Sequence, residues 1–174
     1  MRKIILYTAT VLVVGVLCTL FYSNYQKKKY VKYTKEAVTQ MVGVSAVSEK
    51  ACEFYQVIWR NAIYKEGSYY AGGKYNGKDF NEALVIAKED IKDEIKNLNR
   101  DMEKTTNTMK KLNNPPMKYH ELHDRLVILY SFTKEFNQLA NSPTGSLMSF
   151  SQKVNELESG ISKKVDEITI QLPE

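Results

Sequence analysis

A regular spacing of apolar residues is clearest in residues 79–112, which read DFNEALVIAKEDIKDEIKNLNRDMEKTTNTMKKL. Apolar side chains recur there at alternating steps of three and four, from Phe80 to Leu112. That period places them on one face of an α-helix, and the face must be buried against other elements. Asp79 and Glu82 form a capping-box-like start, and the two prolines that follow the segment cannot continue a helix. The sequence therefore predicts a helix over residues 79–113.

Three further segments repeat this period. The first ends beside a glycine that suits a helix C-terminus, and the second starts at a pair of prolines that suit a first helical turn. The third begins at Ser146, which can cap a helix after the turn sequence SPTG. No segment of useful length alternates with period two, so we expect no sheet. The three helices are predicted over residues 30–66, 115–141 and 146–169.

Short connections between the later helices predict antiparallel neighbours. The fold class is therefore all-α, with an up-down four-helix bundle over residues 36–172. The first two helices are longer than the last two by about 15 Å, so the bundle should have a long first hairpin that projects. This topology returns the turn at residues 113–116 to the side of the bundle on which the first helix begins.

Residues 4–22, IILYTATVLVVGVLCTLFY, contain no charged residue. As an α-helix they would rise about 28 Å, which is close to the thickness of a bilayer's hydrocarbon core. Tyrosines at the ends and lysines beyond them suit the headgroup region. We expect a signal-anchor transmembrane helix over residues 1–24 and a basic juxtamembrane segment over residues 25–35 that continues into the first bundle helix. The residues expected to flank the membrane are Arg2, Lys3, Lys27, Lys28, Lys29 and Lys32.

A cleaved signal peptide is the main alternative, but residues 19–24 lack the small residues that cleavage needs. Lipoprotein processing at Cys18 is disfavoured because Leu17 precedes it. Orientation is open to two interpretations. The lysines after the span favour a cytoplasmic body, whereas the basic pair before the first apolar run is usual in exported chains. We expect a single-pass protein of the cell membrane whose body lies outside the cytoplasm.

The net charge of +5 does not indicate nucleic-acid binding. Seven basic residues flank the apolar run, and the other 18 are outnumbered by 20 acidic residues in the body. A nucleic-acid surface requires clustered lysine and arginine, whereas the body interleaves both signs. The basic character therefore belongs to the predicted membrane flanks.

The segment between the first two predicted helices, residues 67–78, reads GSYYAGGKYNGK. Tyrosines offer a large contact area with a hydrogen-bonding tip, and glycines let a loop conform to a partner. In the alternative interpretation the glycines only make turns, and the tyrosines fold back on the end of the hairpin. The candidate partner-binding residues are Trp59, Tyr64, Tyr69, Tyr70 and Tyr75.

Residues that could carry out chemistry are sparse. His120 and His123 are spaced to meet one metal ion on a helix, but their spacing is not that of a catalytic zinc helix, and no third ligand is evident. Cys52 has no cysteine partner outside the predicted span and no base near it in sequence. No phosphate-binding or dinucleotide motif occurs. The sequence predicts no enzymatic activity, no catalytic residues, no cofactor and no metal.

The turn motifs LNNPP at residues 112–116 and SPTGSL at residues 142–147 carry a family resemblance, together with Tyr119, Leu122, Leu129, Tyr130, Leu139 and Ala140. In these motifs the chain resembles uncharacterised membrane-anchored or lipoprotein-like helical-bundle proteins of Gram-positive bacteria. The resemblance covers the body loosely and implies a location in the bacterial cell envelope, with no assigned activity. The absent lipobox departs from the lipoprotein members of that group.

These observations predict a non-enzymatic membrane-anchored bundle that binds an unknown protein partner or a second copy of itself at the cell envelope, or that has a structural role there. One alternative is an extracytoplasmic bundle that senses a small ligand. The other is a cytoplasmic adaptor tethered to the membrane, which only orientation distinguishes from the first. The long apolar faces are compatible with an internal core and with a coiled-coil dimer.

Overall fold

The computed structural model describes residues 2–64 and 80–173, with side chains for residues 21–64, 82 and 84–173. The described residues form helices and no strand, so the all-α prediction is confirmed. Five α-helices and one short 3₁₀ helix follow one another: α1 (Arg2–Tyr64), α2 (Phe80–Asp90), α3 (Lys92–Lys110), η1 (Met117–Tyr119), α4 (His120–Asn141) and α5 (Leu147–Gln171).

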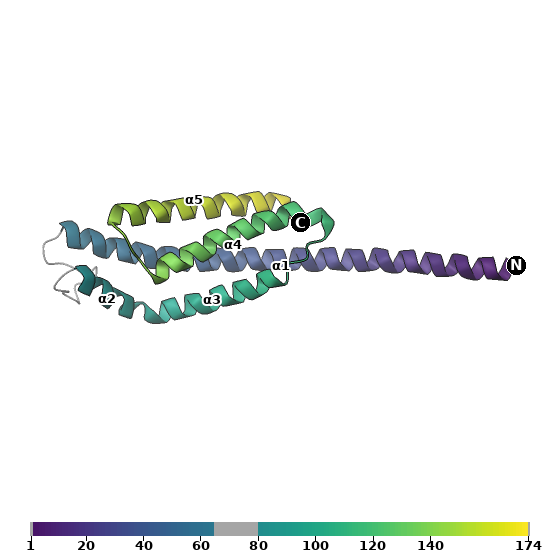
Figure 1. The fold of residues 1–174 in the computed structure, drawn as a ribbon, viewed down its shortest axis with the longest axis horizontal. Coiled ribbons are helices and arrows are strands. Elements are labelled where there is room, and N and C mark those ends of the chain that lie inside the picture. Colours follow the sequence, from purple (N-terminus) through teal and green to yellow (C-terminus); the bar gives the residue numbers. More distant parts are fainter. Residues whose placement is uncertain (1, 65–79, 174) are drawn as a thin grey trace.

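The helices run up and down along one axis (Figure 1). α2 and α3 together return along α1, α4 runs parallel to α1, and α5 returns again. α1 contacts α2, α3, α4 and α5, and α4 contacts α1, α3 and α5. Among the described elements α3 and α5 do not contact each other, so α1 and α4 form the shared centre of the bundle.

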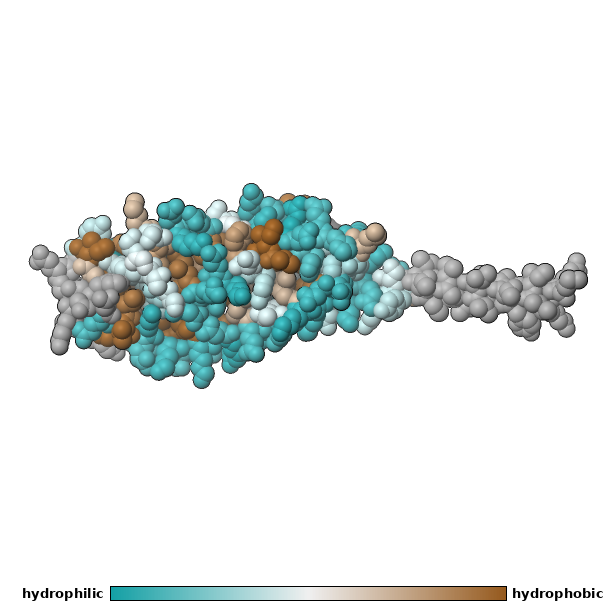
Figure 2. Space-filling model, viewed as in Figure 1, coloured by the Kyte–Doolittle hydropathy of each residue, from teal (hydrophilic) through white to brown (hydrophobic). Residues whose placement is uncertain are grey.

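The core consists of the apolar faces that the sequence predicts. Met41, Tyr55 and Ile58 of α1, Leu98 of α3 and Leu126 of α4 are fully buried. Figure 2 shows a mostly hydrophilic described surface in this view, with apolar side chains in separate patches, chiefly toward the end where α1 meets α2. Burial of one face of each helix against its neighbours is what stabilises such helices in proteins.

α1 has 63 residues and includes both the predicted span and the first bundle helix without a break. Its N-terminal part extends beyond the other helices (Figure 1). None of the helices, within the described residues, combines the length and apolar character needed to cross a membrane. The side chains of residues 4–20, which make up most of the predicted span, lie outside the described ones. The transmembrane helix therefore stays a prediction.

The prediction of one unbroken helix over residues 79–113 is wrong at Ile91, which separates α2 from α3. The Ile91 backbone N–H still donates to the Ala87 carbonyl at 3.3 Å, and the Ile95 N–H donates to the Ile91 carbonyl at 2.9 Å. The chain therefore bends without losing these bonds. Among the described elements α2 contacts α1 and α3 alone, and it lies along α1 beyond the end of α4 (Figure 1).

The helix predicted over residues 115–141 starts later than expected. Pro116 has extended backbone angles (φ −57°, ψ 145°), η1 follows, and α4 begins at His120. A residue that precedes a proline is pushed out of the helical region, so Asn114 and Pro115 cannot form a first helical turn. The predicted start of this helix at residue 115 is therefore wrong, and α4 begins without a side-chain cap.

The predicted cap of the last helix is confirmed. The Ser149 backbone N–H donates to the Ser146 hydroxyl oxygen at 3.2 Å, and the Ser146 N–H donates to the Ser149 hydroxyl oxygen at 3.0 Å. Gly145 before it has φ +94°, a conformation that favours glycine. These contacts fix the start of α5, which begins beyond the end of α4 (Figure 1).

The start of α5 limits how far the first hairpin projects. The Phe150 ring of α5 lies 4.9 Å, centroid to centroid, from the Trp59 ring near the end of α1. α5 therefore accompanies α1 as far as Trp59. The end of α1 and the start of α2 extend beyond the ends of α4 and α5 that lie nearest to them (Figure 1).

Candidate functional site

The bundle has a pocket at the end where α1 leaves it, which we call the basal pocket. Its volume is about 460 Å³, and it lies between α1, the end of α3 and the turn that precedes η1. Three different parts of the chain therefore contribute side chains to it. The lining residues are Tyr22, Gln26, Lys29, Tyr30, Tyr33, Lys111, Asn114 and Pro116.

One wall of the basal pocket is formed by buried aromatic side chains. The rings of Tyr30 and Tyr119 are stacked, with centroids 5.3 Å apart and an interplanar angle of 12°. The Tyr30 hydroxyl shares a hydrogen bond with Nδ1 of His123 at 3.2 Å. Burial raises the pKa of Tyr30 to about 12, so its hydroxyl stays protonated. Burial also lowers the pKa of His123, which keeps the imidazole neutral at pH 7.

Two lysines lie over aromatic rings at this end of the bundle. The Lys111 ammonium lies 5.0 Å from the centroid of the Tyr33 ring, and the Lys118 ammonium lies 5.7 Å from that of Tyr119. Both positions allow a cation to interact with the face of an aromatic ring. Among the described residues that line the pocket, none is acidic.

The lysines predicted to flank the membrane lie along this same part of α1. Lys28, Lys29 and Lys32 are exposed, and Lys27 is half-buried. Of these, Lys29 lines the basal pocket. The side chains of Arg2 and Lys3, also predicted as membrane-flanking, lie outside the described residues.

The candidate partner-binding residues differ in whether the structure describes them and in how exposed they are. Tyr69, Tyr70 and Tyr75 lie outside the described residues. Tyr64, at the end of α1, is 77% exposed. Trp59 is only 6% exposed and packs on Phe150, so the prediction that its ring is available to a partner is wrong. The contact that buries Trp59 comes from α5, far away in sequence.

The structure shows the surroundings of His120, His123 and Cys52. His123 is hydrogen-bonded to Tyr30, as described above, and His120 is exposed. Within residues 2–64 and 80–173, no group of three or more histidine, cysteine or acidic side chains is placed to hold a metal ion. Cys52 is buried, and burial, with a smaller effect of Glu158, raises the pKa of its thiol to about 12. A thiolate nucleophile is therefore disfavoured there.

A second hollow of about 330 Å³ lies between α1, α4 and α5 and carries acidic residues on its rim. Glu49 of α1 and Glu158 of α5 line it, and Glu53 lies one helical turn beyond Glu49. Burial first, and then the charges of Glu49 and Glu53, raise the pKa of Glu158. Like charges brought together in this way favour the protonated carboxyl.

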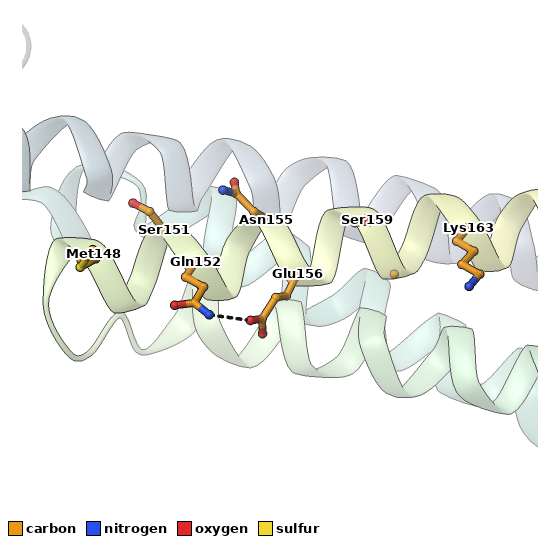
Figure 3. A pocket seen from close by; sticks show the side chains of 8 residues that line it. Met148, Ser151, Gln152, Asn155, Glu156, Ser159 and Lys163 are labelled. Atoms are coloured by element: carbon orange, nitrogen blue, oxygen red, sulfur yellow. Dashed lines mark hydrogen bonds between the residues drawn. The ribbon is translucent and has the colours of Figure 1, made fainter.

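A third hollow, of about 750 Å³, extends along α5 alone (Figure 3). Its side chains point outward from a single helix, and Gln152 Nε2 donates to Glu156 Oε1 at 3.0 Å. Gly160 also lines it, and Phe132 of α4 packs on this glycine, 3.0 Å from the position that a Cβ atom would take. The described lining residues all belong to α5, so no polar group of a second described element faces this hollow.

The sequence analysis missed Lys111 and Tyr33 as members of one site. Two signals point toward Lys111: the turn at residues 113–116 is expected to return to the N-terminal side, and Lys111 lies two residues before that turn. The spacing of apolar residues within each helix does not indicate which face of α1 the turn contacts.

Comparisons with protein-family models, with curated proteins and with solved structures found no match.

Proposed function

We propose that this chain is a non-enzymatic, single-pass membrane protein of the bacterial cell envelope, and that its helical bundle binds a protein partner or a second copy of the chain. The observation that carries the proposal is α1, one helix that holds the uncharged residues 4–22 and then enters the bundle. At 1.5 Å per residue, a helix of 63 residues is about 95 Å long. Such a helix can cross a bilayer and still form the centre of the bundle.

The chemistry of the basal end supports the membrane part of the proposal. Exposed Phe21 and Tyr22 end the uncharged run, exposed Tyr25 follows it, and the lysines come next. Aromatic rings are favoured at the level of lipid headgroups, and lysines are favoured beside anionic lipids. Because α1 has no break between the two parts, the bundle would be held close to the bilayer at a fixed orientation.

The opposite end of the bundle supports the partner part of the proposal. Ile63 and Tyr64 at the end of α1, and Val85 of α2, are exposed. We call these three residues the distal patch. α1 and α2 contact each other, and exposed apolar residues on neighbouring helices are typical of surfaces that bind other proteins. In the sequence, the residues of the distal patch lie on both sides of the tyrosine-rich residues 67–78, the predicted contact segment.

The membrane part is tested by labelling intact cells with a thiol reagent that cannot cross membranes. The variant carries Cys18→Ala and Asn155→Cys, which puts a thiol on the exposed face of α5. Native Cys52 is buried and serves as the unreactive internal control in a variant with Cys18→Ala alone. Labelling before lysis supports an extracytoplasmic body. Labelling only after lysis makes the protein a cytoplasmic adaptor, and release of the chain from membranes by alkaline carbonate would contradict an integral span.

The partner part is tested by crosslinking in isolated membranes. Ile63→Ser with Val85→Ser removes apolar contact at the distal patch, and Val127→Ser with Ile170→Ser is the matched control at exposed apolar positions elsewhere. We expect the crosslinked species, whether a homodimer or a complex with another protein, to decrease in the distal variant and to persist in the control. An equal decrease in both would exclude the distal patch as the contact.

A further inference from the structure

The fold brings the turn between α3 and η1 beside α1 at the level where the predicted span ends. The basal pocket is lined by Tyr22, the last residue of the uncharged run at residues 4–22, and by Pro116 of the turn. Met117, next to Pro116, is 92% exposed. A side chain so fully exposed has almost no apolar contact within the chain itself, and it stands where the bilayer surface would be. The turn is therefore placed to contact lipid.

Two lysines from different helices meet at this pocket. Lys29 belongs to α1, and Lys111 is the residue that follows the end of α3. In a helix the Cα–Cβ bond tilts toward the N-terminus, so Lys29 leans toward the predicted span. The Tyr33 ring lies under the Lys111 ammonium at 5.0 Å and gives that cation a favoured position on the pocket wall. Two cations with no acid among the described lining residues form a site for an anion.

The polar groups around the lysines suit a phosphate ester better than a bare ion. Gln26 and Asn114 can donate hydrogen bonds from their side-chain amides, and Tyr22 can donate one from its hydroxyl. The volume of about 460 Å³ leaves space for a group larger than phosphate. A zwitterionic choline headgroup would bring a cation next to the two lysines, which costs energy, whereas a glycerol headgroup would not.

We infer that the basal pocket binds the headgroup of an anionic phospholipid, with Lys29 and Lys111 on its phosphate and Met117 in contact with the lipid beside it. This inference rests on the proposed function, because it uses the predicted span to place the pocket at the bilayer surface. It deepens that function by naming a class of lipid that the bundle recognises. Binding would fix the bundle against the membrane through the α3–η1 turn as well as through α1.

The test uses the full chain in neutral detergent and short-chain lipids, so that binding does not depend on insertion into a bilayer. Dihexanoyl phosphatidylglycerol, dihexanoyl phosphatidylcholine and inorganic phosphate are each titrated by calorimetry. The variant is Lys29→Gln with Lys111→Gln, and the control is Lys96→Gln with Lys134→Gln, which removes the same charge at exposed positions of α3 and α4. All four lysines are exposed, so we expect each variant to fold.

We expect phosphatidylglycerol to bind the native chain and the control variant with the same affinity. The pocket variant should bind it at least about tenfold more weakly, because two charge-assisted contacts are lost. Equal binding of phosphatidylcholine, or equal losses in the two variants, would overturn the inference. Binding of inorganic phosphate as tight as that of the lipid would assign the site to a free anion instead. Failure of the chain to insert into membranes would contradict the proposed function, and it is measured separately by carbonate extraction.

Discussion

The Tyr30 hydroxyl lies 3.2 Å from Nδ1 of His123, so that α1 and α4 are joined by a hydrogen bond at the end where α1 leaves the bundle. The two residues are also part of one packed group, because Tyr30 stacks on Tyr119 just before α4. This contact connects the helix predicted to enter the membrane with the rest of the fold. We therefore expect the strength of this hydrogen bond to affect the free energy of unfolding of the full chain.

The first prediction concerns pH. The pKa of His123 is lowered in the folded chain, chiefly by burial, so the unfolded chain binds the proton more tightly. The contribution to stability is complete above the unfolded pKa of about 6.5 and is lost as pH falls through the lower folded value. His123→Asn, which cannot titrate there, should reduce the fall in thermal midpoint on acidification from neutral pH. Thermal denaturation in detergent measures this, and an unchanged slope would contradict it.

The next prediction concerns Tyr30, the hydrogen-bond partner of His123 on α1. Tyr30→Phe keeps the stacked ring and removes the hydroxyl. We expect the free energy of unfolding to fall by about 1 kcal/mol, because one hydrogen bond is lost and Nδ1 of a partly buried imidazole is left without it. Tyr25→Phe, at an exposed tyrosine of the same helix, is the control and should leave stability unchanged. The comparison is made by chemical denaturation at neutral pH.

A second pH effect has the opposite sign. The pKa of Glu158 is raised in the folded chain by burial and by Glu49 and Glu53, so ionisation of this carboxyl destabilises the fold. Stability from this residue should increase as pH falls from the raised folded value to the unfolded one. Glu158→Gln should raise the thermal midpoint at neutral pH by about 1–3 °C. Glu156→Gln, exposed on the same helix, should leave it unchanged. A lower midpoint for Glu158→Gln would show that the carboxylate is stabilising.

Gly43 and Gly160 make a third comparison, because both lie inside helices and differ only in their surroundings. Nothing lies within 4 Å of a Cβ atom built on Gly43, whereas the Phe132 ring lies 3.0 Å from one built on Gly160. Gly43→Ala should stabilise the fold by about 1 kcal/mol through helix propensity. Gly160→Ala should gain less or nothing, since Phe132 must move. Equal gains in denaturant titrations would show that Phe132 yields freely.

The sequence predicted the existence of the helices well, because a stripe such as Met41, Tyr55 and Ile58 records burial in its spacing. It did not predict the break at Ile91, since the apolar period continues through that residue. It also missed the pairing of Lys29 with Lys111 in one pocket. That pairing depends on which face of α1 the turn meets, and spacing within a single helix carries no such information.

Trp59 and Tyr64 provide the last prediction, which separates packing from partner binding at the end of α1. Trp59 is buried against Phe150, so Trp59→Ala should lower the free energy of unfolding by about 3–5 kcal/mol. Tyr64→Ala removes an exposed ring and should leave stability within about 0.5 kcal/mol of the native chain while weakening the crosslinked complex. Denaturation and membrane crosslinking are measured on both variants. If Trp59→Ala unfolded like the native chain but lost the complex, Trp59 would be a contact residue after all and not a core residue.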